Sequence, residues 1–328
     1  MEYIQLLGGL ILLIASANYL VKGGENLALR LGLSPLVVGM TVIAFGTSAP
    51  EFIVSLSAAL KGNPQIALGN IIGSNIANIG LILGITALLL PLPVQKASVK
   101  NDGPLLLLAT ILFIVVARNG IIGRWEGIIG LGILIGYTAW MIHKSIKDNQ
   151  DISQEATVTL KPVTAVLFII ISSIGLAYGA DFLIKGASSV ATRFGISQKV
   201  IGITIIAFGT SLPELAASVV AAIKKQTDIS IGNIVGSNLF NILGVIGLSS
   251  AIHPIPVNFP LFKSDFIWML LFSILLLLLI YPLRKNFKAF RQKGNKLSVI
   301  FNIEGGRLGR LSGLLLLGLY IFYIYLLL

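Results

Sequence analysis

Ten apolar segments, each close to the length that crosses a lipid bilayer, constrain this chain more than any other feature of its sequence. Lipid offers the backbone no hydrogen-bonding partner, so a chain crosses it as helices or as a closed barrel. Helical spans need about 17 to 25 residues, whereas barrel strands need only about 10. The sequence therefore predicts an all-α integral membrane protein. The ten expected transmembrane helices cover residues 3–21, 35–60, 66–90, 103–118, 127–143, 163–183, 199–223, 229–252, 266–283 and 311–328.

Composition supports the same class of protein. The chain is 55% hydrophobic and 11% charged, whereas ordinary soluble domains carry about 25% charged residues. The net charge of +11 is therefore interpreted as membrane topology, and no nucleic-acid partner is expected. The chain has no cysteine, which excludes disulfides, thiolate metal sites and cysteine nucleophiles.

Basic residues are distributed unevenly between the loops. If the first loop is cytoplasmic, 17 of the 24 Lys and Arg residues fall in odd-numbered loops and 7 in even-numbered loops. This bias follows the positive-inside rule, so both termini are expected on the extracytoplasmic side of the cell membrane. Segment 284–310 supplies eight of the 17, which fits a topology determinant lying against anionic lipid. A regulatory lipid or partner site is the alternative.

An internal repeat organises the chain. A shift of 163 positions places GMTVIAFGTSAPEF (39–52) over GITIIAFGTSLPEL (202–215), and GNIIGSNIANI (69–79) over GNIVGSNLFNI (232–242). Five spans per copy reverse the orientation of the second copy. We therefore expect two inverted five-helix repeats, 1–150 and 163–328, joined by a cytoplasmic linker at 151–162; the repeated motifs lie at 39–80 and 202–243. The first span matches an internal one, so it is expected to be structural and not a cleaved signal. Inverted repeats are typical of transporters, although ordinary symmetric bundles also arise by duplication.

Each repeat places one glutamate deep in the membrane. Only Glu51 and Glu214, of thirteen acidic residues, fall near the middle of a predicted span, and no span interior offers a Lys or Arg partner. An ionised carboxylate there is costly, so an unpaired one predicts a cation or proton site. The alternative is a protonated glutamate hydrogen-bonded to a neighbour.

The residues around each glutamate fit a cation. On a helix, Thr47 and Ser48 would share one face with Glu51. Pro50 removes a hydrogen bond and crowds the carbonyl of Gly46. The resulting kink is expected to free carbonyl oxygens, and Thr210, Ser211 and Pro213 repeat the pattern. The carbonyls expected to be freed belong to segments 44–47 and 207–210.

The third and eighth spans carry a second polar motif. Ser74 and Asn78 are four residues apart, as are Ser237 and Asn241, so each helix offers a hydroxyl and an amide on one stripe. The GxxxG glycines at 69, 73, 232 and 236 are interpreted as close-packing positions. The other amides, Asn70, Asn75, Asn233 and Asn238, are expected to tie neighbouring helices together.

All these candidate ligands are oxygens. Ca²⁺ takes six to eight oxygen ligands at about 2.3 to 2.6 Å. Zn²⁺ or Cu²⁺ would be expected to recruit histidine, and His143 and His253 lie at span ends.

GTSAPE with GNIIGSNIAN, repeated as GTSLPE with GNIVGSNLFN, resembles the sodium/calcium exchanger family of prokaryotic type across essentially the whole chain. The resemblance implies exchange of Na⁺ for Ca²⁺ at a central cluster, with no cofactor. Glu51 and Glu214 would bind both ions, with the carbonyls of Thr47 and Thr210 completing the Ca²⁺ shell. The other implied ligands are Ala44, Ser48, Ser74, Asn78, Ala207, Ser211, Ser237 and Asn241.

The resemblance also implies that spans 3–21 and 163–183 slide against the other eight, with Gly23, Gly24 and Gly186 as candidate hinges. Many family members have Asp where this chain has Asn241. That departure argues against K⁺ cotransport and leaves the stoichiometry and any proton role open.

Three rival functions fit the sequence less well. A proton-coupled divalent antiporter would use the two glutamates as proton carriers, but the hydroxyl-rich GTS segments favour Na⁺. A channel would show uncoupled flux. An enzyme would need a base beside Ser48 or Ser211, and no deep His or Lys is present. A phosphate-binding glycine loop is absent, so no ATP use is expected. The sequence indicates no oligomeric state.

Overall fold

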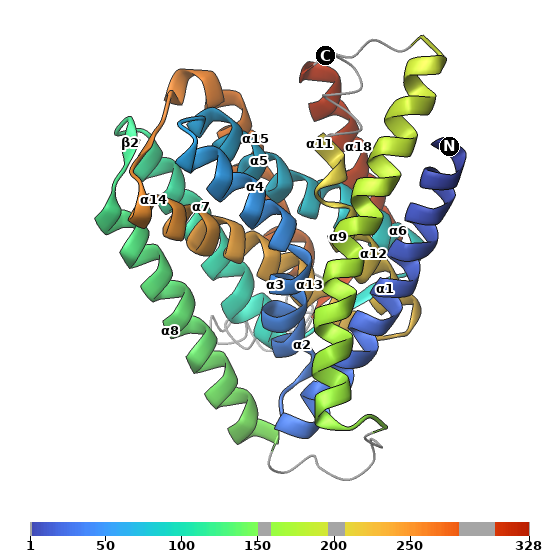
Figure 1. Ribbon diagram of the computed structural model, residues 1–328. Helices are drawn as coiled ribbons and strands as arrows, with labels where there is room; N and C mark the ends of the chain where they lie inside the picture. Colours follow the sequence, from blue (N-terminus) through green and yellow to red (C-terminus); the bar gives the residue numbers. More distant parts are fainter. Residues whose placement is uncertain (1, 150–158, 196–206, 282–305, 328) are drawn as a thin grey trace.

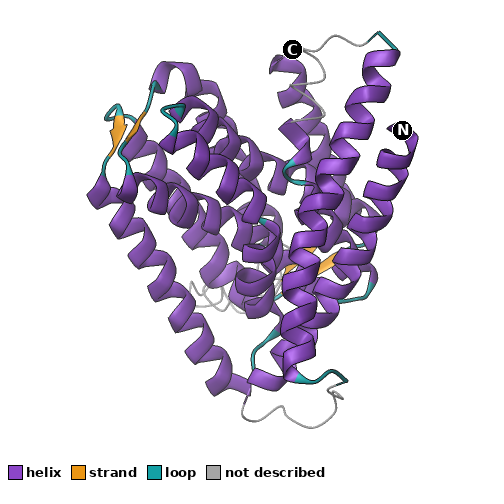
Figure 2. Ribbon diagram, in the orientation of Figure 1, coloured by secondary structure: helices purple, strands orange, loops and turns teal. Residues whose placement is uncertain are grey.

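The computed structural model describes residues 2–149, 159–195, 207–281 and 306–327 (Figure 1). It is almost entirely helical, with two short two-stranded sheets (Figure 2). Within the described residues, eight helices are long and apolar enough to cross a membrane, or nine if one bent pair forms a single span. The chain is thus a multi-span helical protein. The expected seventh span, 199–223, begins outside the described residues.

The first half of the chain contains α1 (Glu2–Leu31), α2 (Pro35–Val38), η1 (Gly39–Ile43), α3 (Ala44–Thr47), α4 (Ala49–Leu60), α5 (Pro64–Ala77), η2 (Asn78–Leu83), α6 (Gly84–Leu89), β1 (Leu92–Val94), η3 (Ser98–Asp102), α7 (Gly103–Ala117), β2 (Ile121–Ile122) and α8 (Arg124–Asn149). The second half contains α9 (Pro162–Arg193), α11 (Ala207–Gly209), α12 (Leu212–Ile223), α13 (Thr227–Leu239), η5 (Phe240–Ile246), α14 (Gly247–Ile252), β3 (Ile255–Pro256), α15 (Phe259–Ile280), β4 (Gly306–Leu308) and α18 (Arg310–Leu327). The segments labelled η are π-helical turns.

Two continuous helical rods form the centre of the molecule, α5–η2–α6 and α13–η5–α14. They are the most buried of the candidate spans, whereas α8 and α18 are the least buried. A Cβ on Gly232 would lie 2.6 Å from the carbonyl oxygen of Leu36, and one on Gly39 would lie 2.7 Å from that of Ile229. Side chains at these positions would separate α13 from α2 and η1. The packing role predicted for the GxxxG glycines is confirmed for the second copy, including Gly236, which lies against Met40.

The GxxxG glycines of the first repeat are packed less tightly than those of the second. The Cβ positions of Gly69 and Gly73 are much less crowded: a Cβ on Gly69 would meet only the Phe262 ring at 3.7 Å, and one on Gly73 would meet nothing within 4 Å. The packing prediction is therefore wrong at Gly73, because the space beside it opens into a cavity between α5, α15 and α18.

Helices α1 and α9 run side by side in opposite directions (Figure 1) and pack against each other more extensively than against any other element. Glycines permit this approach: Gly9 faces Leu183, Gly179 faces Leu13 and Gly23 faces Ala165. Both helices are longer than predicted, because polar residues such as Lys22 and Lys185 continue each helix beyond its apolar stretch.

The hinge role expected of three glycines stays a prediction, and the structure shows where they lie. Gly23, Gly24 and Gly186 lie inside continuous helices. Gly186 packs against the backbone of Leu6 and Gly24 against the side chain of Ile43. Gly23 and Gly186 sit at close contacts between α1 and α9, and the ends of these two helices lie several residues beyond all three glycines.

The odd-numbered loops of the predicted topology lie together at one end of the molecule, and even-numbered loops lie together at the other. At one end β1 pairs with β4, the side-chain amide of Gln95 donates to Asp228 at 2.7 Å, and the backbone N–H of Thr159 donates to Asn26 at 2.9 Å. At the other end β2 pairs with β3. The odd-numbered loops of the predicted topology are thus gathered together.

Candidate cation-binding site

The helix break predicted at the GTSAPE motif is present. Helix α3 ends at Thr47 and α4 begins at Ala49, with Pro50 in its first turn and a bend of 52° between the two segments. The second copy breaks in the same way, with Ser211 preceding α12. Proline is favoured in the first turn of a helix because its missing N–H has no intrahelical partner there.

The break shows that the expected shared helix face is wrong and that the expected freeing of the carbonyls in segment 44–47 is wrong in part. Thr47, Ser48 and Glu51 do not share a face of one helix, because the axis turns at Ser48. The carbonyl of Ala44 is not freed, because it accepts the N–H of Ser48 at 2.9 Å and the hydroxyl of Thr47 at 3.3 Å. The hydroxyls of Thr47 and Ser48 point instead toward the second repeat.

The two glutamates are deeply buried at equivalent places. Glu51 lies in the first turn of α4 and Glu214 in the first turn of α12, and each is 1% exposed. Helix amino termini carry partial positive charge, which stabilises a carboxylate there. The two carboxylates lie close enough to interact electrostatically.

Hydrogen bonds cross between the repeats at this point. The hydroxyl of Ser48 donates to Oε1 of Glu214 at 2.8 Å, and that of Thr47 donates to Oδ1 of Asn233 at 3.1 Å. The repeat counterpart of the second bond, from Thr210 to Asn70, is longer at 3.5 Å. Among the described residues the hydroxyl of Ser211 has no partner. The site is thus built from both halves of the chain but is not symmetric.

Asn70 and Asn233 brace the glutamate helices. Asn70 donates to the hydroxyl of Ser55 at 2.9 Å and to the carbonyl of Glu51 at 3.4 Å. Asn233 makes the same pair of bonds, to Ser218 at 3.0 Å and to the carbonyl of Glu214 at 3.4 Å. The helix-tying role predicted for these two amides is confirmed.

Sequence reasoning missed the partners of these amides. Ser55 and Ser218 are related by the same 163-residue shift, and that was the signal that could have found them. The tie expected of Asn238 to a neighbouring helix is wrong, because its amide donates to the carbonyl of Ile234 within its own helix. Asn75 reaches only the sulfur of Met269, at 4.0 Å.

Asn78 and Asn241 occupy π-helical turns. Asn78 is the first residue of η2 and Asn241 the second residue of η5. Such turns are frequent at functional sites because they displace a side chain from regular helical register. Both amides are buried, and neither has a hydrogen-bond partner within the described part of the chain.

Unpartnered oxygens therefore gather around the two glutamates. Buried polar groups are normally hydrogen-bonded, so several free ones in adjoining elements indicate a ligand. Ser74 lies beside Glu51. Ala207 lies at the edge of the described chain, and its side chain is outside it. Among the candidate ligands, the buried oxygens that have no partner in the described part of the chain are both of Glu51 and one each of Glu214, Asn78, Asn241, Ser211 and Ser237.

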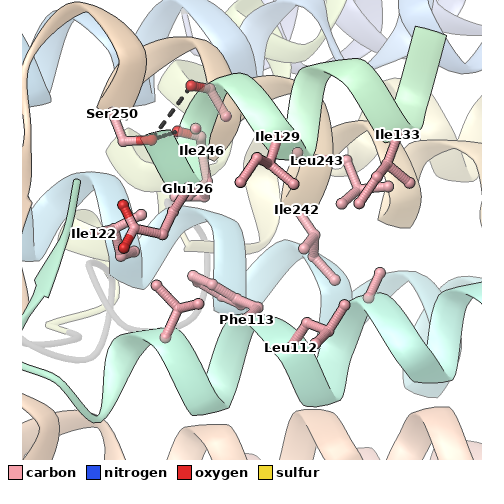
Figure 3. Close-up of a pocket in the computed structure, with 15 residues that line it drawn as sticks. Leu112, Phe113, Ile122, Glu126, Ile129, Ile133, Ile242, Leu243, Ile246 and Ser250 are labelled. Atoms are coloured by element: carbon pink, nitrogen blue, oxygen red, sulfur yellow. Dashed lines mark hydrogen bonds between the residues drawn. The ribbon is translucent and has the colours of Figure 1, made fainter. Parts of the chain in front are cut away.

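An apolar cavity of about 190 Å³ lies on the far side of η5, between α7, α8 and α14 (Figure 3). Phe113 and Leu112 from α7 face Ile129 and Ile133 from α8 across it. It has few polar groups, and the hydroxyl of Ser250 is bonded to the carbonyl of Ile246 at 2.8 Å. This cavity does not suit a hydrophilic ion, so the oxygen cluster is the candidate cation site.

Known proteins resemble the chain closely. A family model described as sodium/calcium exchanger protein matches residues 1–143 and 164–328. The putative antiporter CaxA of Alkalimonas amylolytica is 38% identical over 304 residues, 91% of this chain and 95% of that one. The sodium/calcium exchanger MaX1 of Methanosarcina acetivorans is 30% identical over 295 residues, 78% and 84% of the two chains. The solved structure of the sodium-calcium exchanger NCX_Mj soaked with zero Na⁺ and Ca²⁺ has 33% identity and a TM-score of 0.79, covering 99% of this chain and 98% of that one.

Proposed function

Because the chain belongs to the sodium/calcium exchanger family, a family of membrane antiporters and not of enzymes, we propose that it exchanges Na⁺ for Ca²⁺ by alternating access. The observation that carries this proposal is the cluster of buried, unpartnered oxygens around Glu51 and Glu214. Oxygen ligands without imidazole or thiolate suit hard cations. No cofactor is part of the proposal, and the ions are the cargo.

The charge of the cluster explains the coupling. Glu51 and Glu214 contribute −2 when ionised, which one Ca²⁺ neutralises. Na⁺ ions that use the same oxygens cannot bind together with Ca²⁺, so the two cargoes compete. Exchange follows if the ion-free protein, with its unpaired buried carboxylates, rarely switches the site from one side of the membrane to the other.

The proposed ligands are those expected from the motif positions. Glu51 and Glu214 would bind both ions, with the carbonyls of Thr47 and Thr210 completing the Ca²⁺ shell. The carbonyl of Ala44 is less available, because it already accepts two hydrogen bonds. The remaining proposed ligands are Ser48, Ser74, Asn78, Ala207, Ser211, Ser237 and Asn241.

The α1 and α9 pair is the element that we propose to move. Its two helices pack mainly on each other, and their glycine-lined contacts keep them together as one unit. Movement of this pair against the central rods would open the cluster to one side and then to the other. Since the candidate hinge glycines lie within the packed helices, the loop that follows Leu31 is the proposed flexible point.

The ten-helix arrangement of two inverted repeats, 1–150 and 163–328, joined at 151–162, is part of the same proposal. The equivalent breaks at Ser48 and Ser211 and the equivalent π-turns η2 and η5 support it. Both termini are proposed on the extracytoplasmic side of the cell membrane, supported by the basic bias of the loops that meet at one end. The basic segment 284–310 lies mostly outside the described residues.

A flux measurement in proteoliposomes tests the function. With Na⁺ loaded inside, ⁴⁵Ca²⁺ uptake should require the outward Na⁺ gradient and should fall to background in Glu51→Gln and Glu214→Gln. Glu126→Gln is the matched control, because Glu126 lies on α8 at the apolar cavity and is exposed. Uptake that follows a pH gradient and ignores Na⁺ would establish the proton-coupled alternative in its place.

A further inference from the structure

A polar cavity of about 160 Å³ lies at the end of the molecule where the odd-numbered loops meet. Three separate elements line it with oxygen atoms: Ser34 precedes α2, Gln95, Asn101 and Asp102 belong to the segment around η3, and Ser145 and Asp148 lie on α8. Ser34 is fourteen residues before Ser48, which is about 20 Å along a helix. The cavity is therefore separate from the central cluster.

Asp102 supplies the observation that points to a ligand. Its side chain is only 2% exposed, and the hydroxyl of Tyr137 donates to its Oδ1. Its Oδ2 is buried and has no hydrogen-bond partner in the described chain. A buried carboxylate oxygen without a partner is strongly unfavourable. The hydroxyl of Ser98, one turn earlier on η3, is likewise unpartnered there.

Lys144 also lines the cavity and attracts the Asp102 carboxylate without forming an ion pair with it. Its ammonium lies 5.0 Å from the centroid of the Trp140 ring, in a cation–π contact. It makes no ion pair with Asp102 within the described residues. Asp102, Asp148 and Lys144 together leave the cavity with one net negative charge.

The other repeat shows which part of this arrangement is structural. The same 163-residue shift places Asp265 at the position of Asp102, and the hydroxyl of Tyr323 donates to Asp265 at 2.9 Å. A Tyr–Asp bond between neighbouring helices is thus common to both repeats. Asp265, however, is half-buried and faces a cavity lined by Phe262, Tyr320 and glycines, with no second carboxylate. The oxygen-lined cavity is peculiar to Asp102.

We propose that this cavity binds a hard divalent cation, such as Ca²⁺, with Oδ2 of Asp102 as its charged inner ligand and Asp148 at its mouth. Carboxylate, amide and hydroxyl oxygens from three elements are the ligands such an ion takes. The bound ion would join α2 and η3 to α8. In the proposed topology it would be supplied from the cytoplasm.

Mn²⁺ binding followed by electron paramagnetic resonance tests the site in the full-length chain. The double variant Glu51→Gln and Glu214→Gln serves as the background, since it removes the central carboxylates. In this background one Mn²⁺ should bind per chain. Adding Asp102→Asn should weaken binding at least tenfold, because the amide keeps the acceptor for Tyr137 but places an NH₂ group at the ligand position.

Two further variants make the test decisive. Asp265→Asn is the matched control and should leave Mn²⁺ binding unchanged. Lys144→Gln should tighten it by roughly fivefold, the effect of removing about 1 kcal/mol of charge repulsion. No Mn²⁺ bound at millimolar concentration, or equal binding with and without Asp102→Asn, would overturn the proposal. Because binding is read without transport, a failed flux assay leaves this result intact.

Discussion

The hydroxyl of Ser48 donates to the carboxylate of Glu214 at 2.8 Å, whereas its repeat counterpart Ser211 makes no such bond to Glu51. One glutamate is thus held by the opposite repeat and the other is left with both oxygens free among the described residues. An inverted-repeat transporter must be asymmetric in any single state, since a symmetric arrangement would be equally open or closed to both sides. The Ser48 bond is a local sign of that asymmetry.

This asymmetry predicts unequal effects for two equivalent mutations. Ser48→Ala should lower the stability of the ion-free protein by about 1.5 to 3 kcal/mol, the range for a hydrogen bond to a charged group. Ser211→Ala should change it by less than about 0.5 kcal/mol. Thermal unfolding in detergent without Na⁺ or Ca²⁺ measures both, and equal losses would argue against the asymmetry.

Two of the asparagines of the second motif, Asn233 and Asn238, should also differ. Asn233→Ala removes bonds to Thr47, Ser218 and the carbonyl of Glu214, so it should cost at least about 2 kcal/mol and strongly reduce Na⁺-driven Ca²⁺ uptake. Asn238→Ala is the control, because that amide bonds only within its own helix; uptake should be largely retained. A variant at 238 as inactive as the one at 233 would contradict the bracing role.

Asn241 should determine whether exchange depends on a third cation. Asn241→Asp would make the charge of the cluster more negative, from −2 to −3, so one Ca²⁺ would no longer neutralise it. Uptake by this variant should then be stimulated by K⁺, or by protons, and should decline as pH rises and the added carboxyl ionises. Uptake by the unmodified protein should be indifferent to K⁺ at constant ionic strength. K⁺ stimulation of the unmodified protein would exclude this role for Asn241.

A polar latch ties α1 to the turn between α12 and α13. The side-chain amide of Gln226 donates to Glu25 at 2.6 Å, and the ammonium of Lys224 donates to the carbonyl of Asn18 at 3.0 Å. If α1 and α9 move against the rest, these bonds must break. Gln226→Ala should speed hydrogen exchange of the amides near Glu25 by roughly fivefold, equivalent to about 1 kcal/mol for the loss of one hydrogen bond.

The control for the latch is Lys185→Ala. Lys185 pairs with Asp181 at 2.7 Å within α9 itself, and that pair need not break when α9 moves as a unit. Hydrogen exchange near Glu25 should be unchanged in this variant. Identical exchange in Gln226→Ala and the unmodified protein would show that the latch does not hold the observed arrangement.

The membrane class, the repeat and the two deep glutamates were predictable because each depends on local sequence. The length of each apolar segment identifies a membrane span, and the 163-residue shift identifies the duplication. A carboxylate within an apolar segment can be recognised from the sequence alone. The break at Pro50 was predictable for the same reason, since a proline acts on its own turn of helix. Helix ends were less predictable, because polar residues such as Lys22 and Lys185 continue a helix beyond its apolar part.

What only the tertiary structure decided is which side chain meets which. Ser48 and Glu214 are 166 residues apart, and Thr47 and Asn233 are 186 apart, so no local pattern encodes their contact. The sequence shows identical GTS motifs in both repeats, yet one hydroxyl is bonded and its counterpart is free. The same holds for Asp102 and Asp265, which share a tyrosine partner but face different cavities. Sequence determines which groups are available within the membrane, and packing of the two halves of the chain determines which of them stay unpaired.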